Sequence, residues 1–329
     1  MRLRDEIFPY ANTMVCIEDS KLLKRFQYDI LYNTPGLQAS LDELNKLDYF
    51  RTYETADSGN YSAILDGLMK STFELMTDIV PTQTIRRIFA LYYDIHNMKL
   101  VVKERLFGKR LDSLSFSYGC YSLPTIRSAA VRESDDILKN ETLTSGFFEA
   151  LRAKDAYDVD FILDKTYFRT LKALTVQLGN PAIFKFVVEK VDLFNISALF
   201  QSIAAGNPKG YFSKAFSDQG SATITEWRSY TEGESGEMRE FQLWRKYSPI
   251  WEAAESRRQL SEELDVLIDN YLIEKTKACK LIAFGTAPIC AYFFNKFMEI
   301  KNIRILLTGK AMNYSAYEIQ RRMRIPYEL

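Results

Sequence analysis

The sequence predicts an all-α protein that contains three copies of one helical module. Apolar residues recur at helical spacing along most of the chain, and no segment rich in strand-forming residues competes with them. One short pattern also returns twice: an acidic residue stands three places before an Asn, and an apolar residue follows that Asn. The three occurrences are Asp94 with Asn97, Asp192 with Asn195, and Glu299 with Asn302.

The first copy opens with short helices. Apolar residues keep helical spacing over residues 18–26 and again over residues 37–50. Pro35 and Gly36 break the chain between these two stretches, and the Ser-Gly-Asn sequence at residues 58–60 predicts a turn.

Two longer helices complete the first copy. One begins near Ile64 and runs toward Pro81. Beyond Pro81 a single apolar stripe continues to Phe107, and Gly108 supplies a C-terminal stop. A helix of about 25 residues rises 1.5 Å per residue and is therefore roughly 40 Å long.

The second copy follows the same order. Residues 108–145 are polar-rich, contain Pro124, and predict a loose connection. A helix around Ile162 then matches the helix around Ile64. Asn180 is placed to cap the next long helix, which starts at Pro181 and stops at Gly206.

The third copy is preceded by a Gly-rich segment, residues 206–239, which predicts a long loop or insertion. Within it, residues 222–225 are the only run with some strand character. The markers then return in order with Asp269, Pro288, Asn302 and Gly309.

The spacing of the markers supports true repetition. An Asp precedes the motif Asn by 31, 31 and 33 residues, a Pro by 16, 14 and 14, and a Gly follows it by 11, 11 and 7. Three markers in the same order, three times, predict modules that span residues 1–109, 110–208 and 209–329. The Asp markers are Asp66, Asp164 and Asp269.

The nine repeated polar residues have two interpretations. Asp94 and Asn97 are three apart in a predicted helix and share one face. They can tie the module together, for example through a contact between Asn97 and Asp66, or they can line a metal or ligand site. The tie is favoured because the acid varies and no His or Cys cluster completes a coordination shell.

Motifs for catalysis and cofactors are missing. His96 is the only histidine, and its counterparts are Phe194 and Lys301, so a shared task as a general base is not expected of this position. Neither a phosphate-binding Gly-Lys loop nor a dinucleotide-binding Gly pattern is present. The sequence therefore predicts no catalytic, cofactor or metal residue, and favours a scaffold over an enzyme.

Composition narrows the class of partner. The 43 basic and 43 acidic residues cancel, so the chain lacks the basic character expected of a nucleic-acid binder or of a protein held to anionic lipid by charge. Four scattered Cys residues and a polar start predict a reducing, cytoplasmic setting. The longest apolar run, residues 281–294, is too short to span a bilayer.

The chain resembles the C subunit of bacterial and archaeal vacuolar-type (V/A-type) rotary ATPases, which is related to the eukaryotic d subunit. The resemblance lies in three copies of a helical module, the first of which closes on Tyr93-Asp94-Ile95-His96-Asn97-Met98-Lys99. The ending, with residues 301–310, then Tyr-Glu-Ile at 317–319 and Arg-Arg at 321–322, is also similar to that family. The resemblance covers essentially the whole chain. The second copy departs from it with Ser197 in place of Lys99, and the third with Glu299 in place of Asp.

The resemblance implies a funnel-shaped, three-lobed protein that is not catalytic. It implies a place at the cytoplasmic face of the membrane, between central-stalk subunits of the D/F type and the proteolipid ring, with membrane contact only through that ring. The chain would pass torque from stalk to ring for H⁺ or Na⁺ transport, with the open ends of the lobes and the Gly-rich segment as docking surfaces. Two alternatives stay open: a helical-repeat adaptor for other proteins, and an all-α enzyme with an unrecognised carboxylate site.

Overall fold

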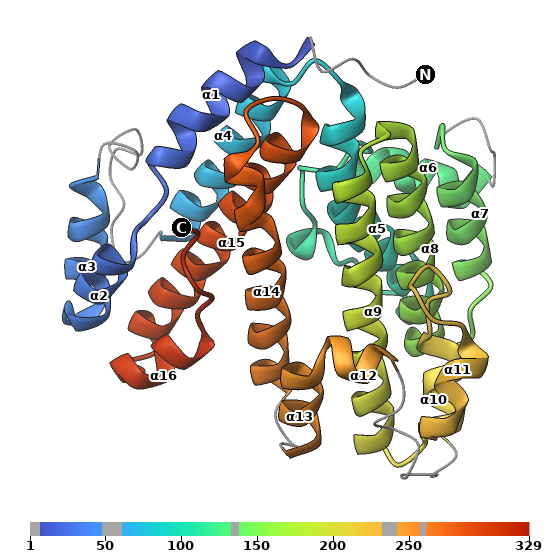
Figure 1. Cartoon of the computed structure of the whole chain (residues 1–329). Coiled ribbons are helices and arrows are strands. Elements are labelled where there is room, and N and C mark those ends of the chain that lie inside the picture. The colour runs from blue at the N-terminus through green and yellow to red at the C-terminus, as the bar shows by residue number, and fades with distance from the viewer. Residues whose placement is uncertain (1–6, 48–60, 133–137, 232–241, 257–260, 329) are drawn as a thin grey trace. The chain divides into compact units, whose positions relative to one another are not determined.

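The predicted all-α class is confirmed by a computed structural model, in which the described residues are 7–47, 61–132, 138–231, 242–256 and 261–328. Throughout these ranges the regular elements are α-helices and short 3-10 helices (Figure 1). The turn predicted at residues 58–60 lies outside the described residues.

The chain divides into two compact units, which are described separately. Unit 1 contains residues 3–83 and 262–329, so it joins the two ends of the chain, whereas unit 2 is the continuous stretch of residues 84–261. The three-module division of the sequence stays a prediction.

In unit 1, the long helix α15 is the central element and packs against α1, α3, α4, η4 and α16. Buried side chains of α15, such as Phe293, Ile300 and Leu307, face these neighbours. The elements of the unit are α1 (Pro9–Ser20), α2 (Arg25–Asn33), α3 (Gly36–Asn45), α4 (Tyr61–Ile79), α14 (Ser261–Lys277), η4 (Ala278–Leu281), α15 (Thr286–Ala311) and α16 (Ala316–Arg322).

In unit 2, α5, α6, α7, α8 and α9 share a continuous apolar core that includes Met98, Ile126, Phe147, Leu163 and Val187. The short helices α10, α11 and α13 extend the unit from α9, because α10 and α13 pack on α9 and α11 packs on α10. The elements are α5 (Gln83–Phe107), η2 (Asp112–Leu114), α6 (Leu123–Arg132), α7 (Glu141–Ala150), α8 (Ala156–Leu178), α9 (Pro181–Ala204), α10 (Pro208–Ala215), α11 (Ile224–Thr231), α12 (Gln242–Lys246) and α13 (Ser248–Ser256).

The three predicted long helices are present as α5, α9 and α15, with 25, 24 and 26 residues. Asn180 caps α9 as predicted, since its side chain accepts the backbone N–H groups of Ala182 and Ile183. Gly108 and Gly206 follow α5 and the last turn of α9 with φ of 64° and 72°, the left-handed conformation that a glycine stop requires.

The third Gly marker does not end its helix. Gly309 lies inside α15, which continues to Ala311, and a Cβ at this position would lie 2.6 Å from Cγ1 of Ile319 on α16. Gly309 therefore permits the close approach of α16 to α15 rather than a turn. The residue with positive φ after this helix is Asn313, at 57°.

Four local predictions were wrong. Residues 18–26 span the junction between α1 and α2 instead of one helix, and the connection at 108–145 contains α6 and the first half of α7. The described part of the Gly-rich segment 206–239 forms α10 and α11, and residues 222–225 lead into α11 rather than forming a strand. The cause in the last case is a capping box, in which the Thr223 hydroxyl accepts the N–H of Glu226 and the Glu226 carboxylate accepts the N–H of Thr223.

Aromatic side chains hold this region to unit 2. Trp227 of α11 stacks on Trp251 of α13 with ring centroids 5.9 Å apart, and it also contacts Phe212 of α10. Trp251 in turn packs against Phe200 of α9. Both Trp side chains are fully buried, so α10 and α11 are integral to the core of unit 2.

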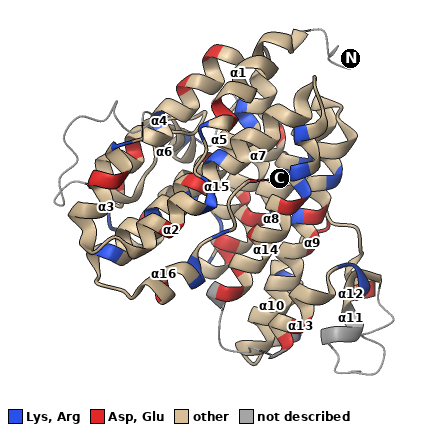
Figure 2. Cartoon of the chain, turned by 60° about the vertical axis from the view of Figure 1, so that its left-hand side comes forward, with Lys and Arg blue, Asp and Glu red and all other residues tan. Residues whose placement is uncertain are grey.

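Acidic and basic residues are interspersed along the helices, in keeping with the zero net charge (Figure 2). Over the residues that the structure describes, no helix is long and apolar enough to cross a membrane.

Candidate functional site

Each repeated Asn binds the backbone of a single residue on the segment that follows its long helix. The side-chain amide donates to the backbone oxygen of that residue, and the side-chain oxygen accepts its backbone N–H. The distances are 2.7 and 3.0 Å for Asn97 with Phe116, 2.9 and 2.9 Å for Asn195 with Ser217, and 3.0 and 2.8 Å for Asn302 with Arg324. The bound residue follows the Asn by 19, 22 and 22 positions.

This two-point pairing explains why an Asn recurs in the middle of a long helix. A primary amide presents one donor and one acceptor side by side, which matches the N–H and C=O of one residue. All three Asn side chains are buried. The hydrogen bonds of Asn195 and Asn302 are buried as well, so their loss would leave backbone groups unpaired away from water, whereas the bonds of Asn97 are partly buried. The bonds of Asn97 go to Phe116 and not to Asp66, the partner suggested from the sequence.

The first two acids bind the same returning segments a few residues further on. Asp94 accepts the backbone N–H of Tyr121 at 3.0 Å, and Asp192 accepts the backbone N–H and the hydroxyl of Ser221, each at 2.7 Å. A glycine lies against each carboxylate: a Cβ on Gly119 would lie 2.3 Å from Asp94 Oδ1, and a Cβ on Gly220 would lie 2.6 Å from Asp192 Oδ1. Acid and Asn together fix the returning segment at two points.

The two carboxylates have different surroundings. Burial raises the pKa of Asp94 to about 6, against the lowering effect of the backbone N–H groups of Tyr121 and Cys120. Asp192 receives a further hydrogen bond from the hydroxyl of Tyr247 at 3.0 Å. Lys246 also lies 3.9 Å from the Asp192 carboxylate.

The third acid uses a different partner. Glu299 accepts the backbone N–H of Leu23 at 2.5 Å, from the junction between α1 and α2, and forms a buried ion pair with Lys296 at 2.9 Å. The N-terminal part of unit 1 therefore supplies the amide that a loop supplies in the other copies, and the longer Glu side chain reaches it.

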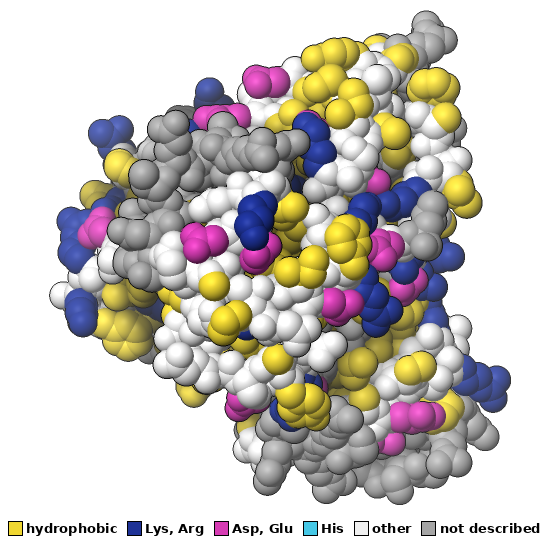
Figure 3. Space-filling view, turned by 90° about the vertical axis from the view of Figure 1, so that its left-hand side faces the viewer, with side chains coloured by type: hydrophobic (Ala, Val, Ile, Leu, Met, Phe, Trp, Pro, Cys, Tyr) yellow, Lys and Arg dark blue, Asp and Glu magenta, His cyan; other side chains and the backbone are white. Residues whose placement is uncertain are grey.

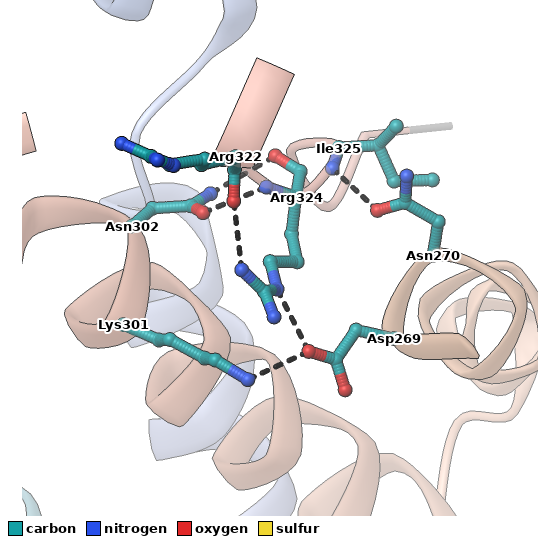
Figure 4. A network of polar contacts seen from close by, with 7 residues as sticks. All are labelled: Asp269, Asn270, Lys301, Asn302, Arg322, Arg324 and Ile325. Atoms are coloured by element: carbon teal, nitrogen blue, oxygen red, sulfur yellow. Dashed lines mark hydrogen bonds and ion pairs between the residues drawn. The ribbon is translucent and has the colours of Figure 1, made fainter. Parts of the chain in front are cut away.

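The Asp markers lie on α4, α8 and α14, the helices that precede the three long helices, and they do not form a common site with the repeated acids. Asp164 on α8 pairs with Lys99 at 2.7 Å, and Asp66 lies exposed on α4. Asp269 on α14 binds Lys301 at 2.8 Å and the guanidinium of Arg324 at 2.7 Å (Figure 4).

Figure 4 shows how the last network ties three elements of unit 1. Asp269 and Asn270 project from α14, Lys301 and Asn302 from α15, and Arg322, Arg324 and Ile325 lie at the end of α16 and on the segment after it. Arg324 is held by both α14 and α15, and Asn270 accepts the N–H of Ile325 at 2.9 Å. A single carboxylate, that of Asp269, is thus shared by Lys301 and Arg324, and the network connects α14, α15 and the segment after α16.

The returning segment of the first copy carries a group of aromatic rings, which we call the aromatic surface. Tyr93 is its centre, with ring centroids 5.2, 5.3 and 5.4 Å from those of Tyr92, Phe116 and Tyr118. His96 stacks obliquely on Phe116 at 4.8 Å, and its Nε2 lies 2.9 Å from the backbone oxygen of Leu114. These rings are exposed or half-buried, and Tyr92 is 57% exposed.

The corresponding residues of the other copies are covered. Ser217 is fully buried and Arg324 is 7% exposed, whereas Phe116 is half-buried. The same pair of hydrogen bonds from an Asn side chain, which we call the anchor, thus holds a core residue in two copies and a surface ring in the first. Sequence reasoning missed the aromatic surface, although the run Phe116-Ser117-Tyr118 close to Tyr92 and Tyr93 was a visible signal.

Basic side chains flank the aromatic surface. Arg86 lies two turns before Tyr93 on α5 and its guanidinium is 3.7 Å from the sulfur of Cys120, while Arg87 is exposed. Within the described part of the chain neither Arg has a carboxylate at salt-bridge distance. The acids at the other end of the segment, Glu104 and Asp112, both pair with Arg127.

Unit 1 also exposes large apolar side chains on three of its helices. They include Tyr10 and Ile17 on α1, Phe26 and Ile30 on α2, and Tyr317 on α16. On the described part of the face in Figure 3, hydrophobic side chains are distributed among charged and polar ones. In the described ranges, no group of three or more His, Cys, Asp or Glu side chains is placed to hold a metal ion.

Comparison with known proteins identifies the family. The sequence model of the family described as ATP synthase (C/AC39) subunit matches residues 11–322. The chain belongs to this family. The resemblance to the C subunit of rotary ATPases that the repeated motif predicted is thereby confirmed.

Curated relatives of this C/AC39 chain match it over nearly their whole length. It is 24% identical to the C subunit of the V-type sodium ATPase of Enterococcus hirae, over 97% of this chain and 98% of the relative. It is also 24% identical to the C subunit of the A-type ATP synthase of Methanococcoides burtonii, over 94% of this chain and 86% of the relative. The corresponding A-type protein of Methanosarcina acetivorans is 23% identical, with 94% and 90% covered.

Proposed function

We propose that this chain is the non-catalytic connector of a rotary ATPase, which couples a rotating central stalk to the proteolipid ring in the membrane. The observation that carries the proposal is the match of the C/AC39 family model to residues 11–322. Relatives that align over most of both chains are named as the C subunits of a V-type sodium ATPase and of A-type ATP synthases. The partners are central-stalk subunits of the D/F type and the ring, at the cytoplasmic face.

The internal construction supports a mechanical role. Three helices of 24 to 26 residues are each tied to a returning segment by two hydrogen bonds from one buried Asn side chain. Long helices with buried polar ties resist bending and sliding, because any displacement leaves backbone groups unpaired away from water. A coupling protein needs this stiffness, since elastic deformation would absorb rotation instead of passing it on.

The test is a reconstitution with purified components. The chain is mixed with a central-stalk complex and with detergent-solubilised proteolipid rings, and the assembly is isolated by size-exclusion chromatography. We expect one complex that contains all three components. Binding to neither component would overturn the proposal and favour a helical-repeat adaptor for other proteins.

A second measurement tests coupling itself. Membranes that contain the ATPase but lack this subunit should hydrolyse ATP without ion transport, and addition of the chain should restore transport of H⁺ or Na⁺. ATP hydrolysis that still proceeds without ion transport after the chain is added would contradict a coupling role.

A further inference from the structure

We propose that the aromatic surface of unit 2 is a docking site for an acidic segment of the central stalk that also carries apolar side chains. The proposal rests on the proposed function for the identity of the partner. It assigns to that partner a surface and a chemistry that neither the family match nor the names of the relatives contain.

The first argument is composition. Clustered Tyr and Phe rings beside Arg are the residue types that dominate binding energy at protein interfaces, because large rigid rings bury area with little loss of side-chain entropy. Tyr92, Tyr93, Phe116 and Tyr118 are in mutual contact through Tyr93, and Tyr92 and Leu114 remain 57% and 55% exposed. A partner that covers them removes this apolar area from water.

The second argument is that the rings are held in place before any partner arrives. Asn97 fixes Phe116 by two hydrogen bonds, and Asp94 fixes Tyr121 five residues later. Gly119 lies directly on the Asp94 carboxylate, so the backbone between these points follows the helix closely. A surface that is ordered in advance loses little conformational entropy when it binds.

The third argument is charge. Arg87 is exposed and Arg86 is half-buried, and neither forms a salt bridge in the part of the chain that the structure describes. Glu104 and Asp112, at the other end of the segment, share the single cation Arg127. Arg86 lies near the buried carboxylate of Asp94, whereas the exposed Arg87 lies near Cys120 and Tyr121 at the end of the returning segment. An acidic partner complements the charge of Arg87 at this end of the aromatic surface.

The comparison among the three copies sharpens the assignment. The anchored residues Ser217 and Arg324 are buried within their own units, so the anchor alone does not require an exposed ring. Only at Phe116 does the same anchor hold an aromatic side chain that reaches the surface. This difference is explained by a contact that one copy makes outside the chain.

The experiment measures binding of the full-length chain to a purified central-stalk complex by isothermal titration calorimetry. Tyr92→Ala and Arg87→Glu change side chains at the surface and leave the anchors of Asn97 and Asp94 untouched. We expect each to raise the dissociation constant about 10-fold or more. The effect of Arg87→Glu should shrink as salt is raised, because screening weakens exposed charges.

Matched controls lie elsewhere in unit 2. Tyr157→Ala removes a Tyr that is 69% exposed on α8, and Lys185→Glu reverses an exposed charge on α9. Both should bind the stalk as the parent does. Thermal unfolding followed by circular dichroism checks that all four variants fold alike.

The outcomes separate the two proposals. If the parent does not bind the stalk, the proposed function fails. If the parent binds and Tyr92→Ala and Arg87→Glu bind equally well, the function stands and the docking site is wrong. Loss of ring binding with stalk binding intact, or loss of a self-association measured by light scattering, would assign the surface to a different occupant and also overturn the proposal.

Discussion

Replacement of Asn195 by Ala tests the claim that the repeated Asn residues hold the fold together. The variant removes both hydrogen bonds to Ser217, at 2.9 Å each, while Ser217 itself stays fully buried. A buried backbone group without a partner costs about 1–3 kcal/mol, so two such groups should lower the free energy of unfolding by roughly 2–6 kcal/mol. For a unit of this size, that corresponds to a fall of roughly 4–24 °C in the melting temperature.

The assay combines thermal unfolding, followed by far-UV circular dichroism, with hydrogen exchange of the peptide that contains Ser217. Hydrogen exchange is included because two compact units need not unfold together. Asn33→Ala is the control: the Asn33 amide bonds to the backbone oxygen of Asp29 at 2.8 Å in an exposed place, and its loss should change stability by less than about 0.5 kcal/mol. An Asn195→Ala protein that melts and exchanges like the Asn33→Ala control would refute the reasoning.

Three further predictions concern the repeated acids and the residues beside them. Folding favours the protonated form of Asp94, because burial raises its pKa from 3.8 to about 6; its stabilisation is present below pH 4 and is lost as the pH rises through 6. The free energy of unfolding of Asp94→Asn, measured with urea, should therefore rise relative to that of the parent by on the order of 2 kcal/mol between pH 4 and pH 7. A difference between variant and parent that is the same at both pH values would contradict this. Gly220→Ala places a Cβ 2.6 Å from Asp192 Oδ1 and should cost about 1–3 kcal/mol, seen as a lower urea midpoint; an unchanged midpoint would show that the segment moves freely. Lys296→Ala leaves buried Glu299 without its ion-pair partner and should cost about 3–5 kcal/mol, while the added change Glu299→Gln should recover part of this loss in a double-mutant cycle.

The long helices could be predicted because their limits are set by local chemistry. Pro181 and the Asn180 cap start α9, and Gly108 with positive φ follows α5, so neighbours in the sequence carry the information. Gly309 shows the limit of this reasoning. A glycine that ends a helix and a glycine that allows another helix to pack closely look alike in a sequence. Only the position of Ile319 against Gly309 distinguishes the two cases.

The partners of the repeated Asn residues could not be predicted. Each Asn binds backbone atoms, which every residue has, so Phe116, Ser217 and Arg324 share no side-chain signature. Glu299 stands where the other two copies have Asp, which indicates that the acid of the third copy has a different partner. That partner, the backbone N–H of Leu23, lies 276 residues away in the chain.

The composition of unit 1 has a consequence for the order of events during synthesis. Its N-terminal helices bind α15 through contacts such as Leu23 with Glu299, and Lys310 with the backbone oxygens of Tyr32 and Thr34, which are 276 to 278 residues apart in the chain. Unit 2 is continuous and can fold as soon as it leaves the ribosome. Helices α1 to α3 are made before α15 and must therefore wait for it, and until α15 emerges their apolar faces are exposed to chaperones and to aggregation.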